Sequence, residues 1–183
     1  QLPVVRFNTR SGQLAVKHEV DLISMDCPSL PPSKCGNPPR ELVDGLSGGN
    51  ASSNRDVMYQ PRIFQTKNNY FVVYEDEDQV RNISPDFERL KQLHPFGVCV
   101  TAPGNDSDFV SRYFVPSYGI PEDPVTGSTH SSLIPYWSKV RQKQKFHARQ
   151  VSKRGGEVWC ELHGERVILK GNAVLYLTGT ISL

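Results

Sequence analysis

The chain has 183 residues, of which 37% are hydrophobic and 22% are charged, a balance typical of a packed domain and not of a disordered chain. The formal net charge is only +2, from 21 basic and 19 acidic side chains, so composition indicates neither nucleic acid nor a membrane surface as the main partner. No apolar run approaches the roughly 20 residues that a membrane span requires.

The first part of the chain is predicted to form strands. Alternating apolar and polar residues favour strands at residues 2–7, 13–20 and 22–26, with Gly12 at the corner of the first turn. Residues 27–39 contain five prolines, which exclude a helix there and indicate an extended linker between two structural units.

The middle of the chain mixes short helices with strands. An acidic run at residues 75–83 indicates a helical turn, and Ser84 followed by Pro85 predicts the N-cap and first position of another helix. The other elements predicted here are a helix at residues 40–46 and strands at residues 56–60, 63–66, 70–74, 97–102 and 109–115.

The clearest helical pattern covers residues 128–140, where Leu133, Ile134, Trp137 and Val140 form one apolar stripe. Small hydroxylated residues open this helix, which allows neighbouring backbone to approach closely, and a proline at position 135 removes one backbone donor from its middle. Strands are then predicted at residues 145–152, 157–162, 166–170 and 173–183. Because strands dominate and tight turns join them, we expect an α+β fold with a mainly antiparallel sheet.

The segment "EDPVTGS" at residues 122–128 stands directly before this helix. A helix start leaves about four backbone N–H groups without partners, and the helix dipole adds positive potential there, so an anion such as a carboxylate can bind. Ser128 would add a hydroxyl donor, and Asp123 would accept a hydrogen bond from a substrate hydroxyl or amine. Simple helix capping is the competing interpretation of the same residues. His130 lies too close to Ser128 on the helix to form a hydrolase triad with it, so we expect a packed or capping histidine.

The four cysteines, Cys27, Cys35, Cys99 and Cys160, include no C-x-x-C pair, so we predict no metal site. Scattered thiols in a chain of this size are typical of a reduced, cytoplasmic protein. A disulfide between Cys27 and Cys35 remains open at this point. The sequence also starts without the basic and apolar regions of a signal peptide.

The stretch "SRYFVPSYGIPEDPVTGSTHSSLIPYW" at residues 111–137 resembles the signature of the phenazine-biosynthesis isomerase (PhzF-like) family. Residues 9–16, 154–157 and 171–183 support the resemblance, which covers nearly the whole chain. It implies a diaminopimelate epimerase-like fold with two similar α+β lobes, each a mostly antiparallel sheet curled around a central helix. It also implies an isomerase that moves a proton within a small carboxylate-bearing metabolite, with no metal and no organic cofactor.

The resemblance also implies roles for single residues. Asp123 matches the catalytic aspartate that holds the substrate, while Gly127, Ser128 and Thr129 match the substrate-binding helix start. The family's general-base glutamate, in an S-E-T motif, and its histidine, in a G-H motif, have no counterpart in this sequence. We therefore expect residues 1–28 to be the closing strands of a truncated first lobe and residues 29–183 to be the second lobe. The alternative is a catalytically silent ligand-binding or protein-interaction module.

The predicted partners are a small carboxylate metabolite and a second copy of the chain. Apolar residues on strands 2–7 and 13–16 would be left exposed by a truncated lobe, and such surface favours a homodimer. The basic run at residues 139–154 combines a helix end with a strand, so its charges would point in several directions. We predict no nucleic-acid binding and no membrane association.

Overall fold

The computed structural model describes residues 4–10, 12–19, 21–47 and 61–180. Their strands form one sheet in the order β1-β2-β3-β12-β11-β10-β8-β7-β6-β5-β4, and β9 pairs with β8 outside this path. Among the described strands only β6–β7 and β8–β10 pair in parallel. The predicted α+β class with a mostly antiparallel sheet is confirmed.

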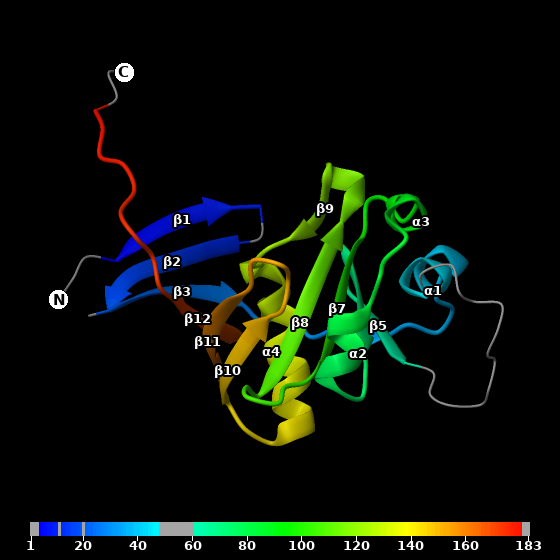
Figure 1. The fold of residues 1–183 in the computed structure, drawn as a ribbon. Coiled ribbons are helices and arrows are strands. Elements are labelled where there is room, and N and C mark those ends of the chain that lie inside the picture. The colour runs from blue at the N-terminus through cyan, green and yellow to red at the C-terminus, as the bar shows by residue number, and fades with distance from the viewer. Residues whose placement is uncertain (1–3, 11, 20, 48–60, 181–183) are drawn as a thin grey trace.

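Figure 1 shows the arrangement of the strands and helices. The strands are β1 (Val5–Thr9), β2 (Gly12–Glu19), β3 (Leu22–Pro28), β4 (Ser33–Lys34), β5 (Arg62–Gln65), β6 (Asn69–Val73), β7 (Gly97–Pro103), β8 (Phe109–Val115), β9 (Ile120–Asp123), β10 (Lys145–Gln150), β11 (Gly156–His163) and β12 (Arg166–Gly171). The helices are α1 (Arg40–Leu46), α2 (Glu77–Asn82), α3 (Phe87–Lys91), α4 (Gly127–Arg141) and the 3-10 turn η1 (Pro116–Tyr118).

Helix α4 is the centre around which the sheet curls. Leu133, Ile134 and Trp137 are buried in a cluster that includes side chains from β6, β7, β8, β10, β11, β12 and β3. Val140, predicted to belong to the same stripe, is 44% exposed, because it lies near the helix end where the sheet no longer covers it. Helices α1, α2 and α3 cover the other face of β5–β8 and enclose a second apolar cluster (Figure 1).

The linker crosses α4 at its internal proline. Pro135 has no N–H, so the Ser131 carbonyl four residues earlier lacks its usual helical donor. The Leu30 amide supplies that donor at 2.8 Å. The predicted extended conformation of residues 27–39 is confirmed, although the segment also contributes to the end of β3 and forms β4.

Strands β1–β3 are part of the same hydrogen-bonded sheet as the rest of the chain. Six residues of β3, from Ile23 to Pro28, pair with β12, and β2 and β1 follow outward from β3. The first turn has Gly12 at a φ of 101°, which is the left-handed conformation expected for its corner.

Two predictions about elements were wrong. The helix expected to have Ser84 as its N-cap and Pro85 as its first residue begins at Phe87, because the Asp86 carboxylate caps it by accepting from the Arg89 amide at 3.1 Å. The segment expected to form a strand from residue 173 has no regular structure over residues 172–180. Its β-type composition finds no partner strand in the described chain, so its side chains stay exposed. Exposed fractions reach 92% at Val174 and 96% at Tyr176.

Strand β9, which carries Asp123, was not predicted, since "IPED" has little strand character on its own. The strand predicted at residues 56–60 lies outside the described residues. Among the described helices, none is both long enough and apolar enough for a bilayer-spanning segment.

Candidate active site

The loop between β9 and α4 is anchored by one buried glutamine. Gln150, 1% exposed, accepts from the Thr126 amide at 2.8 Å and donates to the Asp123 carbonyl at 2.5 Å. Its amide nitrogen also lies 3.2 Å from the Thr126 hydroxyl. Gln150, at the end of β10, therefore holds the backbone on both sides of Pro124.

The turn between β10 and β11 holds the same loop from outside. The Ser152 hydroxyl donates to the Pro124 carbonyl at 2.7 Å. Gly155 has a φ of 71°, and a Cβ on Gly156 would lie 2.4 Å from the Val125 side chain. The two glycines of the "RGGE" segment are thus explained by a left-handed turn and by close approach to the loop.

The first turn of α4 is not capped by a side chain. Thr126 is the N-cap residue, but its hydroxyl donates to Asp123 Oδ2 at 2.5 Å instead of accepting from the helix. The amides of Gly127 and Ser128 precede the first helical hydrogen bond, and no other acceptor in the described part of the chain reaches them. Of the two interpretations weighed from the sequence, side-chain capping of this helix is therefore excluded among the described residues.

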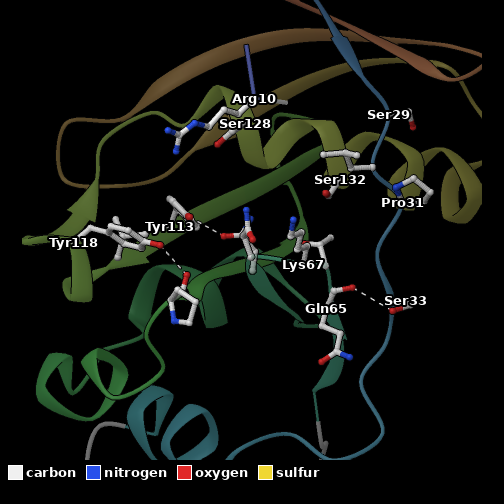
Figure 2. Close-up of a pocket in the computed structure, with 16 residues that line it drawn as sticks. Arg10, Ser29, Pro31, Ser33, Gln65, Lys67, Tyr113, Tyr118, Ser128 and Ser132 are labelled. Atoms are coloured by element: carbon white, nitrogen blue, oxygen red, sulfur yellow. Dashed lines mark hydrogen bonds between the residues drawn. The ribbon is translucent and has the colours of Figure 1, made fainter. Parts of the chain in front are cut away.

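A pocket of about 1200 Å³ opens at this end of α4 (Figure 2). It is lined by segments from both ends of the sheet together with the linker. Its polar side chains are Arg10, Ser29, Ser33, Gln65, Thr66, Lys67, Asn68, Asn69, Tyr113, Tyr118, Ser128 and Ser132. Two cations and no carboxylate are among the lining residues, so the potential in the pocket favours anions.

The predicted site residues contribute unequally to this pocket. Ser128 is exposed and lines it. Gly127 and Asp123 are half-buried next to the pocket but are not among its lining residues. Thr129 is 1% exposed, and its hydroxyl donates to the Thr126 carbonyl at 3.1 Å, so its side chain is committed to the helix start.

Two tyrosines on the pocket wall were not foreseen from the sequence. The Tyr113 hydroxyl donates to Asn69 Oδ1 at 2.7 Å, and the Tyr118 hydroxyl donates to the Pro95 carbonyl at 2.9 Å (Figure 2). Burial, followed by the nearby Cys99 thiol, raises the pKa of Tyr113 well above its usual range. Tyr113 therefore remains a neutral phenol that faces the pocket.

His130 is a packed histidine, as expected. It is fully buried, and its Nδ1 lies 2.7 Å from the Thr126 carbonyl, which can only accept, so Nδ1 carries the proton. Burial lowers the pKa of His130 to about 4, and the hydrogen bond to Thr126 opposes that shift. The neutral ring holds the loop carbonyl and takes no direct part in the pocket.

All four cysteines are free thiols, so Cys27 and Cys35 form no disulfide in the structure. Burial raises the pKa of Cys99 and of Cys160 well above the usual range, which keeps both thiols neutral. No cluster of His, Cys, Asp or Glu suitable for a metal ion occurs in the described ranges.

Comparison with known proteins gives one consistent family. The sequence profile of the PhzC-PhzF family, described as phenazine biosynthesis-like protein, matches residues 3–179. An uncharacterized isomerase of Pseudomonas aeruginosa is 42% identical over 181 residues, which cover 99% of this chain and 65% of the relative. A phenazine biosynthesis-like domain-containing protein of Bos taurus is 35% identical and covers 96% of this chain.

Solved structures agree with the sequence matches. A PhzF-family phenazine biosynthesis protein of Enterococcus faecalis superimposes with a TM-score of 0.81 at 37% identity, covering 98% of this chain and 65% of that one. A similar protein of Clostridium difficile gives a TM-score of 0.79 at 35% identity. This chain thus spans 65% of the length of the first of these curated relatives and of both solved structures.

Proposed function

Because the chain belongs to the phenazine biosynthesis-like (PhzC-PhzF) family, we propose that it is a cofactor-independent isomerase that moves a proton within a small carboxylate-bearing metabolite. Relatives named as isomerases support the general reaction class. The observation that carries the finer proposal is the uncapped start of α4 beside a pocket that contains cations and no carboxylate.

In this proposal the Gly127 and Ser128 amides bind the substrate carboxylate, with the Ser128 hydroxyl as an additional donor. The unsatisfied N–H groups and the helix dipole favour a negative charge at this position. Thr129 contributes through its place in the first helical turn. Asp123 binds a hydroxyl or amine of the substrate through Oδ1, because its Oδ2 already accepts from the Thr126 hydroxyl.

A second candidate function follows from the missing motifs. The resemblance implies a base in an S-E-T motif and a histidine in a G-H motif, and these 183 residues contain neither motif. A chain without a base would still bind the metabolite, as a silent ligand-binding or interaction module. We also propose that residues 1–28 are the closing strands of a first lobe and residues 29–183 the second lobe.

Deuterium incorporation separates the two functions. The chain is incubated in D₂O with a library of small carboxylates, while binding is followed by calorimetry and C–D bond formation by NMR. The isomerase predicts binding together with incorporation of deuterium at carbon, because the transferred proton passes through an exchangeable group. The silent module predicts binding alone.

Substitutions at the site provide the control. Ser128→Ala should weaken carboxylate binding and Asp123→Asn should weaken binding of carboxylates that also carry a hydroxyl or amine, whereas Ser138→Ala, at the far end of the same helix, should change neither. Unchanged binding in both site variants would refute the placement of the substrate.

We propose a homodimer and a cytoplasmic location. Val5 and Phe7 on the edge strand β1 are 51% and 50% exposed, and the apolar side chains of residues 174–177 are exposed as well. Exposed apolar surface at an unpaired strand edge favours association. A single monomer peak in gel filtration across a wide concentration range would contradict the dimer.

A further inference from the structure

The proposed function gives a role to one anion site, yet the pocket contains two cations from separate parts of the chain. Arg10 lies in the turn between β1 and β2, and Lys67 lies in the turn between β5 and β6. These strand pairs are near opposite ends of the sheet order, so the curled sheet brings the two charges to one pocket. No ion pair formed by the described residues involves either side chain.

Lys67 stands on a well-anchored turn. The Thr66 amide donates to the Asn69 carbonyl at 2.9 Å, and the Gly97 amide donates to the Asn68 carbonyl at 3.0 Å. Both ends of the turn are therefore held by backbone hydrogen bonds, one within the hairpin and one to β7. The backbone of Lys67 therefore has a fixed position at the edge of the pocket, although its side chain is exposed.

Polar groups without partners continue along the pocket from α4. Ser128 and Ser132 lie one helical turn apart and both line the pocket, so their hydroxyls share one face of the helix (Figure 2). Ser132 is only 3% exposed, and no hydrogen bond among the described residues involves its hydroxyl. The oxygen of this hydroxyl is not fully enclosed, so a ligand or water in the pocket can pair with it.

The opposite wall offers a further donor beside Lys67. Asn69 Oδ1 accepts from the Tyr113 hydroxyl at 2.7 Å, which orients the amide so that its NH₂ group is available to a ligand. Asn69 also lines the pocket. Lys67 and the Asn69 amide thus form a second group of donors, separate from the helix start.

We propose that this pocket selects a small dianionic metabolite, a dicarboxylate, with one carboxylate at the Gly127 and Ser128 amides and the second at Lys67 and Asn69. Arg10 balances the remaining charge from the β1–β2 turn. The helix start and the pair Lys67–Asn69 are two separate donor groups, which suit two carboxylates better than one, and Arg10 and Lys67 offset most of the charge of a dianion with Asp123 beside the pocket. This inference rests on the proposed function for the first carboxylate only.

Calorimetric titration with matched ligands tests the second carboxylate. Succinate, glutarate and adipate are compared with their monomethyl esters, which keep the chain length and remove one charge. We expect at least one diacid to bind about tenfold more tightly than its own ester, the effect of one charge-assisted contact. Lys67→Met should abolish that ratio and leave ester affinity unchanged. Lys91→Met, which removes an exposed lysine on α3 outside the pocket, should preserve it.

The possible results separate this inference from the function on which it rests. Esters that bind as tightly as diacids, with both weakened by Ser128→Ala, would refute the dianion and leave the proposed function intact. A diacid preference that survives Lys67→Met would also refute the inference, because the second carboxylate would then be bound elsewhere. Diacid binding that depends on Lys67 but not on Ser128 would overturn the helix-start site. Absence of binding by every diacid and ester would refute both proposals.

Discussion

Replacing Gln150 with leucine should destabilise the loop that presents the proposed site. The side chains are similar in size, so the substitution removes hydrogen bonds without opening a large cavity. It leaves the Thr126 amide without its acceptor at 2.8 Å and the Asp123 carbonyl without its donor at 2.5 Å. The two groups lie at the two ends of the loop between β9 and α4, since Asp123 ends β9 and Thr126 is the N-cap residue of α4.

The size of the effect follows from these two groups. A buried polar group that loses its partner costs about 1–3 kcal/mol, so two such groups give a loss of about 3 kcal/mol in the free energy of unfolding when solvent partly compensates one. For a chain of this length each kcal/mol lowers Tm by about 2–4 °C, so Gln150→Leu should lower Tm by about 10 °C. Carboxylate affinity should fall as well, because the loop leads directly into the first turn of α4.

Thermal unfolding followed by circular dichroism measures the first effect, and calorimetric titration with a small carboxylate measures the second. Gln144→Leu is the matched control, since Gln144 is exposed and, within the described residues, its one hydrogen bond is from the Leu162 amide to its backbone carbonyl. A Gln150→Leu protein with a Tm within about 2 °C of the wild type would refute the anchoring role. A destabilised protein with unchanged carboxylate affinity would refute the link between this anchor and the helix start.

Three further substitutions test other parts of the structure. Gly156→Ala places a Cβ 2.4 Å from Val125 and should lower the free energy of unfolding, measured with denaturant, by about 1–3 kcal/mol. Gly171→Ala, with open space around it, should lower it by no more than a few tenths of a kcal/mol. Equal effects would contradict the close approach of Gly156 to Val125. His130 has a folded-state pKa of about 4 against an ordinary 6.5, so the unfolded chain binds the proton more readily. The free energy of unfolding should therefore fall by about 3 kcal/mol as the pH drops from above 6.5 towards 4. An equally steep fall in His130→Asn would refute the assignment of this pH dependence to His130. Phe7→Lys should shift the proposed dimer towards monomer in analytical ultracentrifugation, and an unchanged sedimentation profile would place any interface elsewhere.

Local pattern was sufficient for most elements of the fold. The predicted helix at residues 40–46 has the same bounds as α1, and the predicted helix at residues 128–140 differs from α4 by one residue at each end. Apolar periodicity is a property of neighbouring residues, so it survives in the folded chain. The segment from residue 173 shows the limit, because a strand also needs a partner with free hydrogen-bonding groups.

The sequence likewise predicted some residues of the candidate site and missed others. Asp123, Gly127 and Ser128 stand together in the sequence, so the signature and the helix start were enough to propose them as site residues. Gln150 and Lys67 carried no local signal, since a lone glutamine in a strand and a lone lysine in a turn are ordinary surface residues until their neighbours are known.

By itself, the sequence determined the α+β class, the helix around which the sheet curls, and the short segment before that helix for which we propose anion binding. Tertiary structure alone decided that Thr126 turns its hydroxyl to Asp123 instead of capping α4, and that Arg10 and Lys67 reach the same pocket. The physical reason is the separation along the chain over which each effect acts. Periodicity and helix-end chemistry depend on residues a few positions apart, whereas the pocket is assembled by strand pairing across the whole curled sheet.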